Sequence, residues 1–264
     1  MIARTPMPSV YLPHGGGPAF FMSGPMAELF RPMGLFLASV PALLPALPTA
    51  VLVVTAHWES DATTFSAGAH PQLVYDYHGF PPETYSITYA APGAPELADH
   101  AAGLLRRAGL HAAVDPAHGW DHGVFIPLKV MLPQADIPVL AMSLTRGLDP
   151  NLHARIGEAL RPLRSDGVLI MGSGMSYHNL QQMGNGAAAI TFDRWLDGAL
   201  AGDAAHRRSW LSGWSRAPSG RAAHPREEHL LPLMVASGAG GDTPARKLWS
   251  GAVGPTAVSA WAFD

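Results

Sequence analysis

The sequence predicts an α/β fold of three layers, in which helices cover both faces of a largely buried sheet. Short apolar runs typical of buried strands alternate along the chain with segments whose apolar residues have helical spacing. The 264 residues are 48% hydrophobic and 14% charged, which suffices to bury a sizeable core. The sequence has neither an internal repeat nor a convincing linker, so we expect a single catalytic domain over residues 1–264.

The predicted strands are short apolar runs. A strand end is expected at 10–12, and further strands are expected at 50–55, 138–144, 168–171 and 258–262. Residues 64–89 are rich in Tyr, Phe and Pro, and we expect strands and loops there. The polar, Gly- and Ser-rich segment 210–225 is typical of a surface loop.

The predicted helices lie between recognisable start and stop signals. Ser23 is a candidate cap for a helix over 25–38, which Pro32 would kink or split. Gly109 and Pro162 follow two further helical patterns and end them. The helical patterns cover residues 95–108, 151–161, 187–200 and 228–236.

Composition excludes several classes of protein. The formal net charge is -3 and there is no basic block, so we expect no nucleic-acid partner. Residues 1–8 have no apolar signal core, and prolines interrupt the longest apolar stretches. We therefore expect no membrane partner and a cytoplasmic location. The absence of cysteine excludes disulfides and thiolate metal sites, so any metal must be held by His, Asp or Glu.

Three histidines occupy positions typical of metal ligands. His14 and His57 each follow an apolar run, and side chains beyond strand ends point into the crevice where open α/β sheets bind ligands. His229 precedes an apolar Leu-Leu-Pro-Leu run, where a helix start gives a histidine no dipole benefit. These residues predict a mononuclear site for iron, manganese or zinc, with Glu228 as an alternative third donor. An incidental turn residue at His14 and a core histidine at His57 are the structural alternatives.

Two more histidines are candidates for proton transfer. His122 lies in Trp-Asp-His-Gly, and His178 lies in Gly-Ser-Gly-Met-Ser-Tyr-His-Asn-Leu shortly after a predicted strand. An ordinary imidazole takes and gives a proton near neutral pH, although a structural role is the alternative for either residue. Glu59 is a candidate to orient a neighbouring ligand ring, and Asp121 is a candidate to orient a ring or cap a helix.

Two serines raise the possibility of a serine hydrolase. Ser173 lies between two glycines, and Ser176 follows in the same segment. The surrounding residues are not the Gly-x-Ser-x-Gly elbow, and the expected order of serine, acid and histidine has no clear match. The sequence therefore disfavours this reading.

Seven short motifs together cover almost the whole chain. They are His-Gly-Gly-Gly-Pro at 14–18, Ala-His-Trp at 56–58, Tyr-Asp-Tyr-His-Gly-Phe-Pro at 75–81, Tyr-Ala-Ala-Pro-Gly at 89–93, Gly-Trp-Asp-His-Gly at 119–123, Gly-Ser-Gly-Met-Ser-Tyr-His-Asn-Leu at 172–180 and Glu-His-Leu-Leu-Pro-Leu at 228–233. In this order they resemble the motifs of DODA-type extradiol ring-cleavage dioxygenases, within the class III, LigB-like superfamily.

The resemblance implies an α/β/α fold around a mixed central sheet. It also implies a non-haem Fe(II) site at His14, His57 and His229, with His178 as acid/base and His122 contacting substrate or dioxygen. Zinc is possible as the isolated metal. In the wider superfamily the third ligand is a carboxylate, whereas His229 takes that role here, beside Glu228.

The function predicted from these motifs is that of a metal-dependent extradiol dioxygenase. Its substrates would be a small aromatic diol of the catechol type, as in DOPA 4,5-dioxygenases, and dioxygen. Four aromatic residues are candidates for the pocket walls: Trp58, Phe80, Tyr85 and Tyr177. A zinc-dependent hydrolase with a metal-activated water is the alternative enzyme. A metal-binding protein without catalysis is a third reading, which would leave His122 and His178 without a role.

Overall fold

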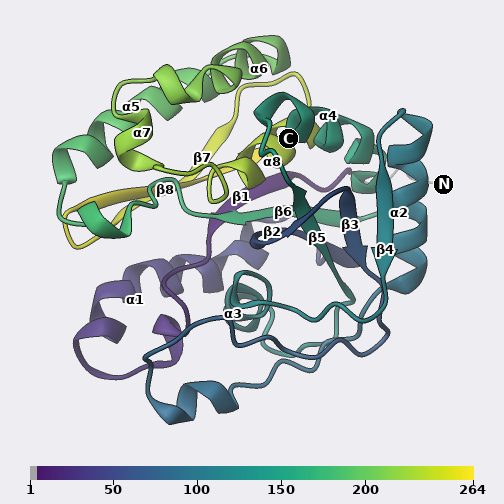
Figure 1. Cartoon of the computed structure of the whole chain (residues 1–264), viewed down its shortest axis with the longest axis horizontal. Helices are drawn as coiled ribbons and strands as arrows, with labels where there is room; N and C mark the ends of the chain where they lie inside the picture. The colour runs from purple at the N-terminus through teal and green to yellow at the C-terminus, as the bar shows by residue number, and fades with distance from the viewer. Residues whose placement is uncertain (1–4) are drawn as a thin grey trace.

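The described residues, 5–264, form one eight-stranded sheet in this computed structural model (Figure 1). The strands are Ser9–Pro13 (β1), Ala50–Ser60 (β2), Thr63–Ser66 (β3), Ala112–Asp115 (β4), Val139–Thr145 (β5), Val168–Gly174 (β6), Arg246–Val253 (β7) and Thr256–Phe263 (β8). Their order in the sheet is β4-β3-β5-β2-β6-β1-β8-β7. The sheet is mixed: β5, β2, β6 and β1 run parallel, whereas β8 is antiparallel to both β1 and β7.

Helices cover both faces of this sheet (Figure 1). They are Gly24–Ser39 (α1), Pro95–Arg107 (α2), His122–Met131 (α3), Pro150–Leu160 (α4), Gly186–Leu200 (α5), Ala204–Ser212 (α6), Gly220–Ala223 (α7) and Leu231–Ala239 (α8). One core contains buried residues of α2, α4, α5 and α8, and the other contains those of α1 and α3. The predicted three-layer α/β/α architecture with a mixed sheet is therefore confirmed.

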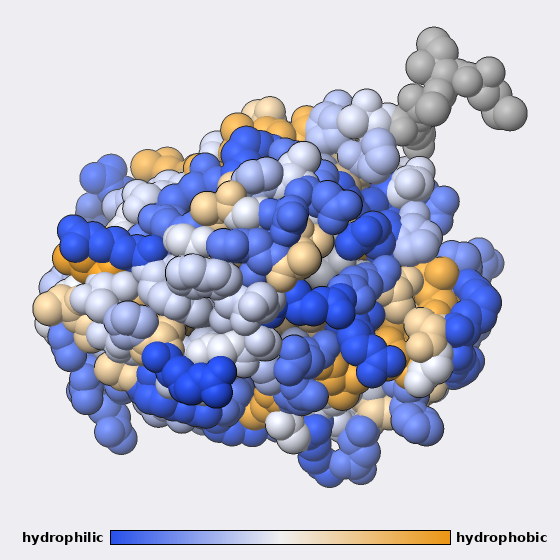
Figure 2. All heavy atoms as spheres, turned by 90° about the horizontal axis from the view of Figure 1, so that it is seen from above, coloured by the Kyte–Doolittle hydropathy of each residue, from blue (hydrophilic) through white to orange (hydrophobic). Residues whose placement is uncertain are grey.

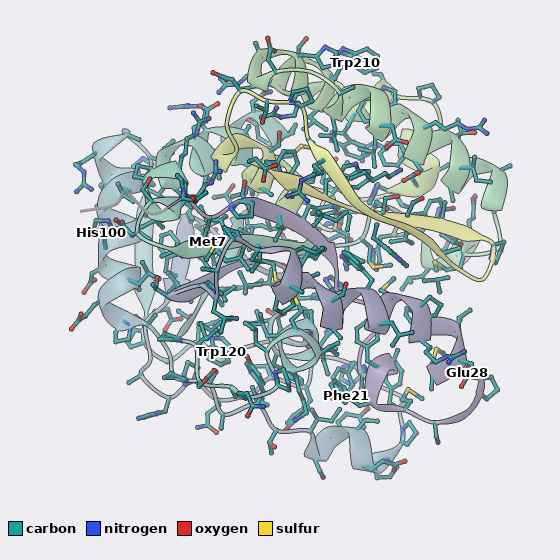
Figure 3. The ribbon with its side chains drawn as sticks, turned by 180° about the vertical axis from the view of Figure 1, so that it is seen from behind. Met7, Phe21, Glu28, His100, Trp120 and Trp210 are labelled. Carbon is teal, nitrogen blue, oxygen red and sulfur yellow. The ribbon has the colours of Figure 1, made fainter. Side chains whose placement is uncertain are left out.

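The two helical layers are distinct in the view from behind (Figure 3). Trp210 of α6 lies in one layer, and Phe21 and Trp120 lie on the opposite side of the sheet. Trp120 is fully buried, whereas Trp210 is 42% exposed. The outer surface above α5 and α6 is mostly hydrophilic, with smaller apolar patches (Figure 2).

Helix α1 differs from its prediction. Pro32 lies inside a helix that remains continuous, and with the following 3-10 turn the segment Gly24–Leu43 has 20 residues. This segment is long and apolar enough to cross a membrane by length and composition alone, so the prolines do not interrupt this apolar stretch as expected. One face of it packs against the sheet through Phe30, Met33, Phe36 and Leu37, and most of its other residues are not buried.

Several other boundaries also shift. Strand β2 continues five residues beyond the predicted end at residue 55, and the glycines after Met171 belong to β6. Helix α8 begins at Leu231 and not at residue 228, and the predicted loop 210–225 contains the short helix α7. The side chain of Ser23 makes no capping hydrogen bond. Part of the expectation for residues 1–8 concerns residues 1–4, which lie outside the described residues.

Candidate metal and dioxygenase site

Five histidines meet at the carboxyl ends of three parallel strands. His14 directly follows β1, His57 lies near the end of β2, and His178 follows β6. His122 is the first residue of α3, and His229 stands two residues before α8. Since the carboxyl ends of parallel strands form the ligand-binding edge of open α/β sheets, the topology brings these distant residues to one place.

The three predicted ligands form a nearly equilateral triangle. The ring centroids of His14 and His57 are 4.9 Å apart, those of His14 and His229 are 5.1 Å apart, and those of His57 and His229 are 4.9 Å apart. The Nε2 atoms of His14 and His57 lie 3.2 Å apart. The Nε2 atom of His229 is buried without a hydrogen-bond partner. An orphaned buried nitrogen is costly unless a ligand satisfies it.

The Nδ1 atom of each ring faces an oxygen, and the Nδ1 atoms of His14 and His229 are hydrogen-bonded to theirs. The hydroxyl of Ser173 donates to the carbonyl oxygen of Gly123 at 2.5 Å, so its oxygen accepts from His14 Nδ1 at 3.0 Å. Asp76 Oδ2 lies 3.4 Å from His57 Nδ1, and Glu228 Oε1 lies 3.1 Å from His229 Nδ1. An Nδ1–H held in this way leaves the lone pair on Nε2, which is the arrangement of a metal-binding histidine.

The Nε2 atoms of His14 and His57 are spaced as two ligands of one divalent metal ion would be. Two nitrogens bound roughly 2.0–2.1 Å from one ion at an angle between 90° and 109° lie roughly 2.9–3.4 Å apart, a range that includes the His14–His57 separation. Burial lowers the pKa of His14 and His57, and lowers that of His229 to about 4, with the neighbouring histidines adding to the effect. Neutral rings are the form that binds metal.

His122 and His178 lie against this triangle. The ring of His122 is 4.0 Å from that of His57, and its Nδ1 is 2.8 Å from Asp76 Oδ1. The ring of His178 stacks on that of His229 with centroids 3.3 Å apart. The donor atoms of His14, His57 and His122 all lie within 4.8 Å of one another. The same holds within a second set, formed by His178, Glu228 and His229. The ligand set of His14, His57 and His229 stays a prediction.

Two carboxylates bind these histidines and are ionised despite partial burial. Burial opposes ionisation of Glu228, but hydrogen bonds from His178 and His229 hold its pKa well below the usual range. Burial likewise opposes ionisation of Asp76, and hydrogen bonding from His122 lowers its pKa. Both carboxylates add negative charge beside the rings, which favours a bound cation.

A cavity of about 710 Å³ opens over the histidine cluster. Phe80 and Tyr177 line this cavity, together with the glycines that follow His14. Gly15 and Gly17 have φ of 84° and 54°, and a Cβ at Gly15 would lie 2.6 Å from the Phe20 ring. Glycine is therefore required where the backbone turns beside His14.

A comparison with known families identifies the family of the chain. Residues 7–261 match the family described as the catalytic LigB subunit of aromatic ring-opening dioxygenase. The chain belongs to the LigB family. It is an extradiol ring-cleaving dioxygenase, as its motifs predict.

Named relatives of this LigB-family chain agree with that assignment. It is 38% identical over 252 residues to dioxygenase tasH of Hapsidospora irregularis, covering 88% of this chain and 78% of the relative. It is 38% identical over 248 residues to the 4,5-DOPA dioxygenase extradiol of Portulaca grandiflora, covering 91% and 89%. A crystal structure of an uncharacterized protein from Escherichia coli superposes with a TM-score of 0.75 at 27% identity, covering 98% of this chain and all of that one.

Two predicted wall residues of this LigB-family site lie elsewhere. The ring of Trp58 stacks on that of His118, with centroids 3.6 Å apart, and does not line the cavity. Successive side chains of a strand point to opposite faces, so Trp58 faces away when His57 faces the cluster. Tyr85 is also outside the cavity lining, where its hydroxyl donates to the carbonyl oxygen of Tyr77 at 3.3 Å.

The predicted orienting carboxylates are also corrected. Glu59 pairs with Arg226 at 2.6 Å and orients no ligand ring. Asp121 makes no side-chain cap; it accepts from Thr55 Oγ1 at 2.7 Å, and burial raises its pKa to about 6. Sequence reasoning missed Asp76, which contacts both His57 and His122. Its position inside the Tyr-Asp-Tyr-His motif was the available signal.

The two serines are engaged in structural hydrogen bonds. The hydroxyl of Ser173 is committed to the carbonyl oxygen of Gly123 and to His14. Ser176 Oγ accepts from the backbone amide of Ser259 at 2.9 Å, far along the chain. Neither serine is activated as a nucleophile, in agreement with the sequence reading.

Proposed function

We propose that this LigB-family protein opens the ring of a catechol beside one hydroxyl, using dioxygen and an Fe(II) ion held by His14, His57 and His229. The observation that supports the ligand set is the fixed direction of the three rings. Each Nδ1 atom faces an oxygen, on Ser173, Asp76 or Glu228, which leaves the Nε2 atom of each ring to bind a metal ion.

The choice of metal follows from the donor atoms and the reaction. Three neutral imidazoles suit Fe(II), Mn(II) or Zn(II). A site with thiolate ligands is excluded because the chain has no cysteine. When bound, Fe(II) supplies open coordination positions and an accessible change of oxidation state, which zinc lacks. The adjacent carboxylates of Asp76 and Glu228 offset part of the added positive charge.

His178 is the proposed acid/base. Its Nδ1 atom lies 3.5 Å from Glu228 Oε1, and its ring is fixed by stacking on His229. The remaining nitrogen, Nε2, is the one left for substrate. His178 takes a proton from a catechol hydroxyl and later returns a proton to an oxygen of the opened ring, a role that one imidazole fills near neutral pH.

His122 is the proposed contact to the reacting oxygen atoms. Asp76 Oδ1 accepts hydrogen bonds from the backbone amide of His122 at 2.9 Å and from the ring Nδ1 of His122 at 2.8 Å. These two hydrogen bonds hold the ring in place. This fixed ring lines the cavity beside His14 and His57. A polar group held in advance where charge develops costs no reorganisation during reaction.

Reaction with oxygen tests this function. The protein is loaded with Fe(II) without oxygen and then given dioxygen and a catechol, and we expect a yellow hydroxymuconic semialdehyde with one dioxygen consumed per ring. The zinc-loaded protein is the control, which should bind the catechol without opening it. Equal activity of zinc and iron forms on an ester or amide without dioxygen would establish a hydrolase instead. A cytoplasmic location stays part of the proposal, and cell fractionation tests it.

A further inference from the structure

We propose that the catechol accepted by this site carries an uncharged, apolar substituent, and not a carboxylate or an amino-acid side chain. This inference rests on the proposed ring-opening function and names its substrate class. It is supported by three features of the cavity over the histidine cluster: its size, its lack of charged walls and its apolar mouth.

The cavity is larger than a bare catechol requires. Its volume of about 710 Å³ lies within the roughly 300–1,000 Å³ of pockets that enclose drug-sized ligands. A single aromatic ring placed over the histidines would leave most of that space empty. The remainder is therefore available to a substituent on the ring.

Apart from the exposed imidazole of His78, the walls outside the histidine cluster offer no partner for a charged substituent. Among the described residues, no Lys, Arg, Asp or Glu lines the cavity. The hydroxyls of Tyr77 and Tyr177 already donate to the carbonyl oxygens of Thr84 and Gln182, at 2.7 and 3.0 Å. Within the described part of the chain, the lining has one imidazole outside the histidine cluster, that of His78, and it is exposed to solvent. A buried carboxylate or ammonium without a partner is strongly disfavoured.

The walls and the mouth are instead apolar. Side chains above the histidines come from Phe30, Phe80, Met175, Met183 and Val253. The mouth carries Met26 and Leu29, each 38% exposed, and Leu180, which is 72% exposed. Large apolar side chains that remain exposed together at a cavity mouth are typical of a surface that an apolar ligand covers.

A homologous series of substrates tests this inference. We expect kcat/KM for 4-alkylcatechols to rise roughly fourfold with each methylene from methyl to pentyl, mainly through KM, as expected for burial of apolar surface. The charged probes are 3-(3,4-dihydroxyphenyl)propanoate and DOPA, which should react less well than 4-propylcatechol. Preference for either charged probe, or no dependence on alkyl length, would overturn the inference.

Binding measurements separate this inference from the proposed function. Isothermal titration calorimetry of the same series on the zinc-loaded protein reports affinity without turnover. If unsubstituted catechol is opened but alkyl length affects neither binding nor kcat/KM, the substrate class is wrong and the function stands. If no catechol is opened but affinity rises with alkyl length, the function is wrong and the preference of the cavity stands.

A charge introduced at the mouth provides a second test. Leu180→Lys places an ammonium at the exposed rim, and we expect kcat/KM for the propanoate, relative to 4-propylcatechol, to rise roughly two- to fivefold, the worth of an exposed ion pair. Leu35→Lys is the matched control, since Leu35 is 65% exposed on α1 and does not line the cavity. An equal change in both variants would show that the rim does not select the substituent.

Discussion

The ring of His178 lies parallel to that of His229, with centroids 3.3 Å apart and planes within 14° of each other. One oxygen, Glu228 Oε1, faces the Nδ1 atoms of both rings, at 3.5 and 3.1 Å. A single carboxylate therefore orients the proposed acid/base and a proposed metal ligand together. Arg226 lies 3.5 Å from the second oxygen of Glu228.

Removal of the His178 ring tests whether His178 acts as an acid/base or as a metal ligand. We expect His178→Ala to retain its metal and fold but to open catechols roughly 10²–10⁴-fold more slowly, the usual worth of positioned proton transfer. His122→Ala should also retain metal and lose activity. Metal content and kcat of the purified variants provide the measurement. Loss of metal from His178→Ala would make His178 a ligand.

Removal of a proposed metal ligand should lower the metal content, whereas removal of His178 should not. We expect His14→Ala, His57→Ala and His229→Ala to lose most of their bound metal while the fold, held mainly by apolar burial, survives. His70→Ala is the control, since His70 is exposed and does not line the cavity. Elemental analysis with circular dichroism checks both points. Full occupancy in His229→Ala would move the third ligand to Glu228 or His122.

The Asp76 carboxylate should matter more than that of Glu59. Asp76→Asn keeps the shape but removes the charge that accepts from His57 and His122, so we expect metal affinity or activity to fall roughly 10–100-fold. Glu59→Gln should retain its metal, because Glu59 pairs with Arg226. Competition with a metal chelator measures both affinities. Equal losses would mean that the ion pair of Glu59 supports the site as strongly as Asp76 does.

Acid should destabilise the metal-free protein through His224. Burial lowers the pKa of this ring from 6.5 to about 3, and its Nε2–H donates to the carbonyl oxygen of Ser176. Below pH 6.5 the unfolded chain binds a proton that the folded chain does not, so stability is complete above pH 6.5 and falls as the pH decreases toward 3. The expected slope from this group is roughly 1.4 kcal/mol per pH unit.

Urea unfolding at several pH values between 5 and 7 tests that slope. His224→Gln keeps an N–H donor for Ser176 without a titrating ring, so its stability should depend less steeply on pH by roughly the same amount. Both the unchanged protein and His224→Gln are measured without metal, because metal affinity at the nearby site depends on pH. Identical slopes would assign the acid sensitivity to other groups.

Much of the layout could be predicted because local patterns carry it. Apolar runs locate β1, β5 and β6, and helical spacing locates α2 and α5, within a few residues. Strand β7 was missed because its side chains are mostly part-exposed, so it has no continuous apolar run. Pro32 did not split α1, since packing of that helix on the sheet overrides the lost hydrogen bond.

The site was predicted only where a residue follows a strand or stands in a motif. His14 and His178 are such residues, and their placement beside one another depends on β1 and β6 being neighbours. Asp76 contacts His57 and His122 from a loop, and the motif around Asp76 does not by itself indicate which rings it meets. Trp58 was misplaced because β2 continues past His57, so alternation along the strand turns it away.

The position of β1 in the sheet has a consequence for how the protein is made. This strand lies between β6 and β8, whose residues begin at Val168 and Thr256, so both its edges are paired only after residues far along the chain have been synthesised. His14 likewise emerges long before His229. A chain still on the ribosome therefore holds only part of its metal-binding set, and contacts so distant in sequence form slowly. The complete set of three proposed ligands therefore becomes available only after His229 has been synthesised.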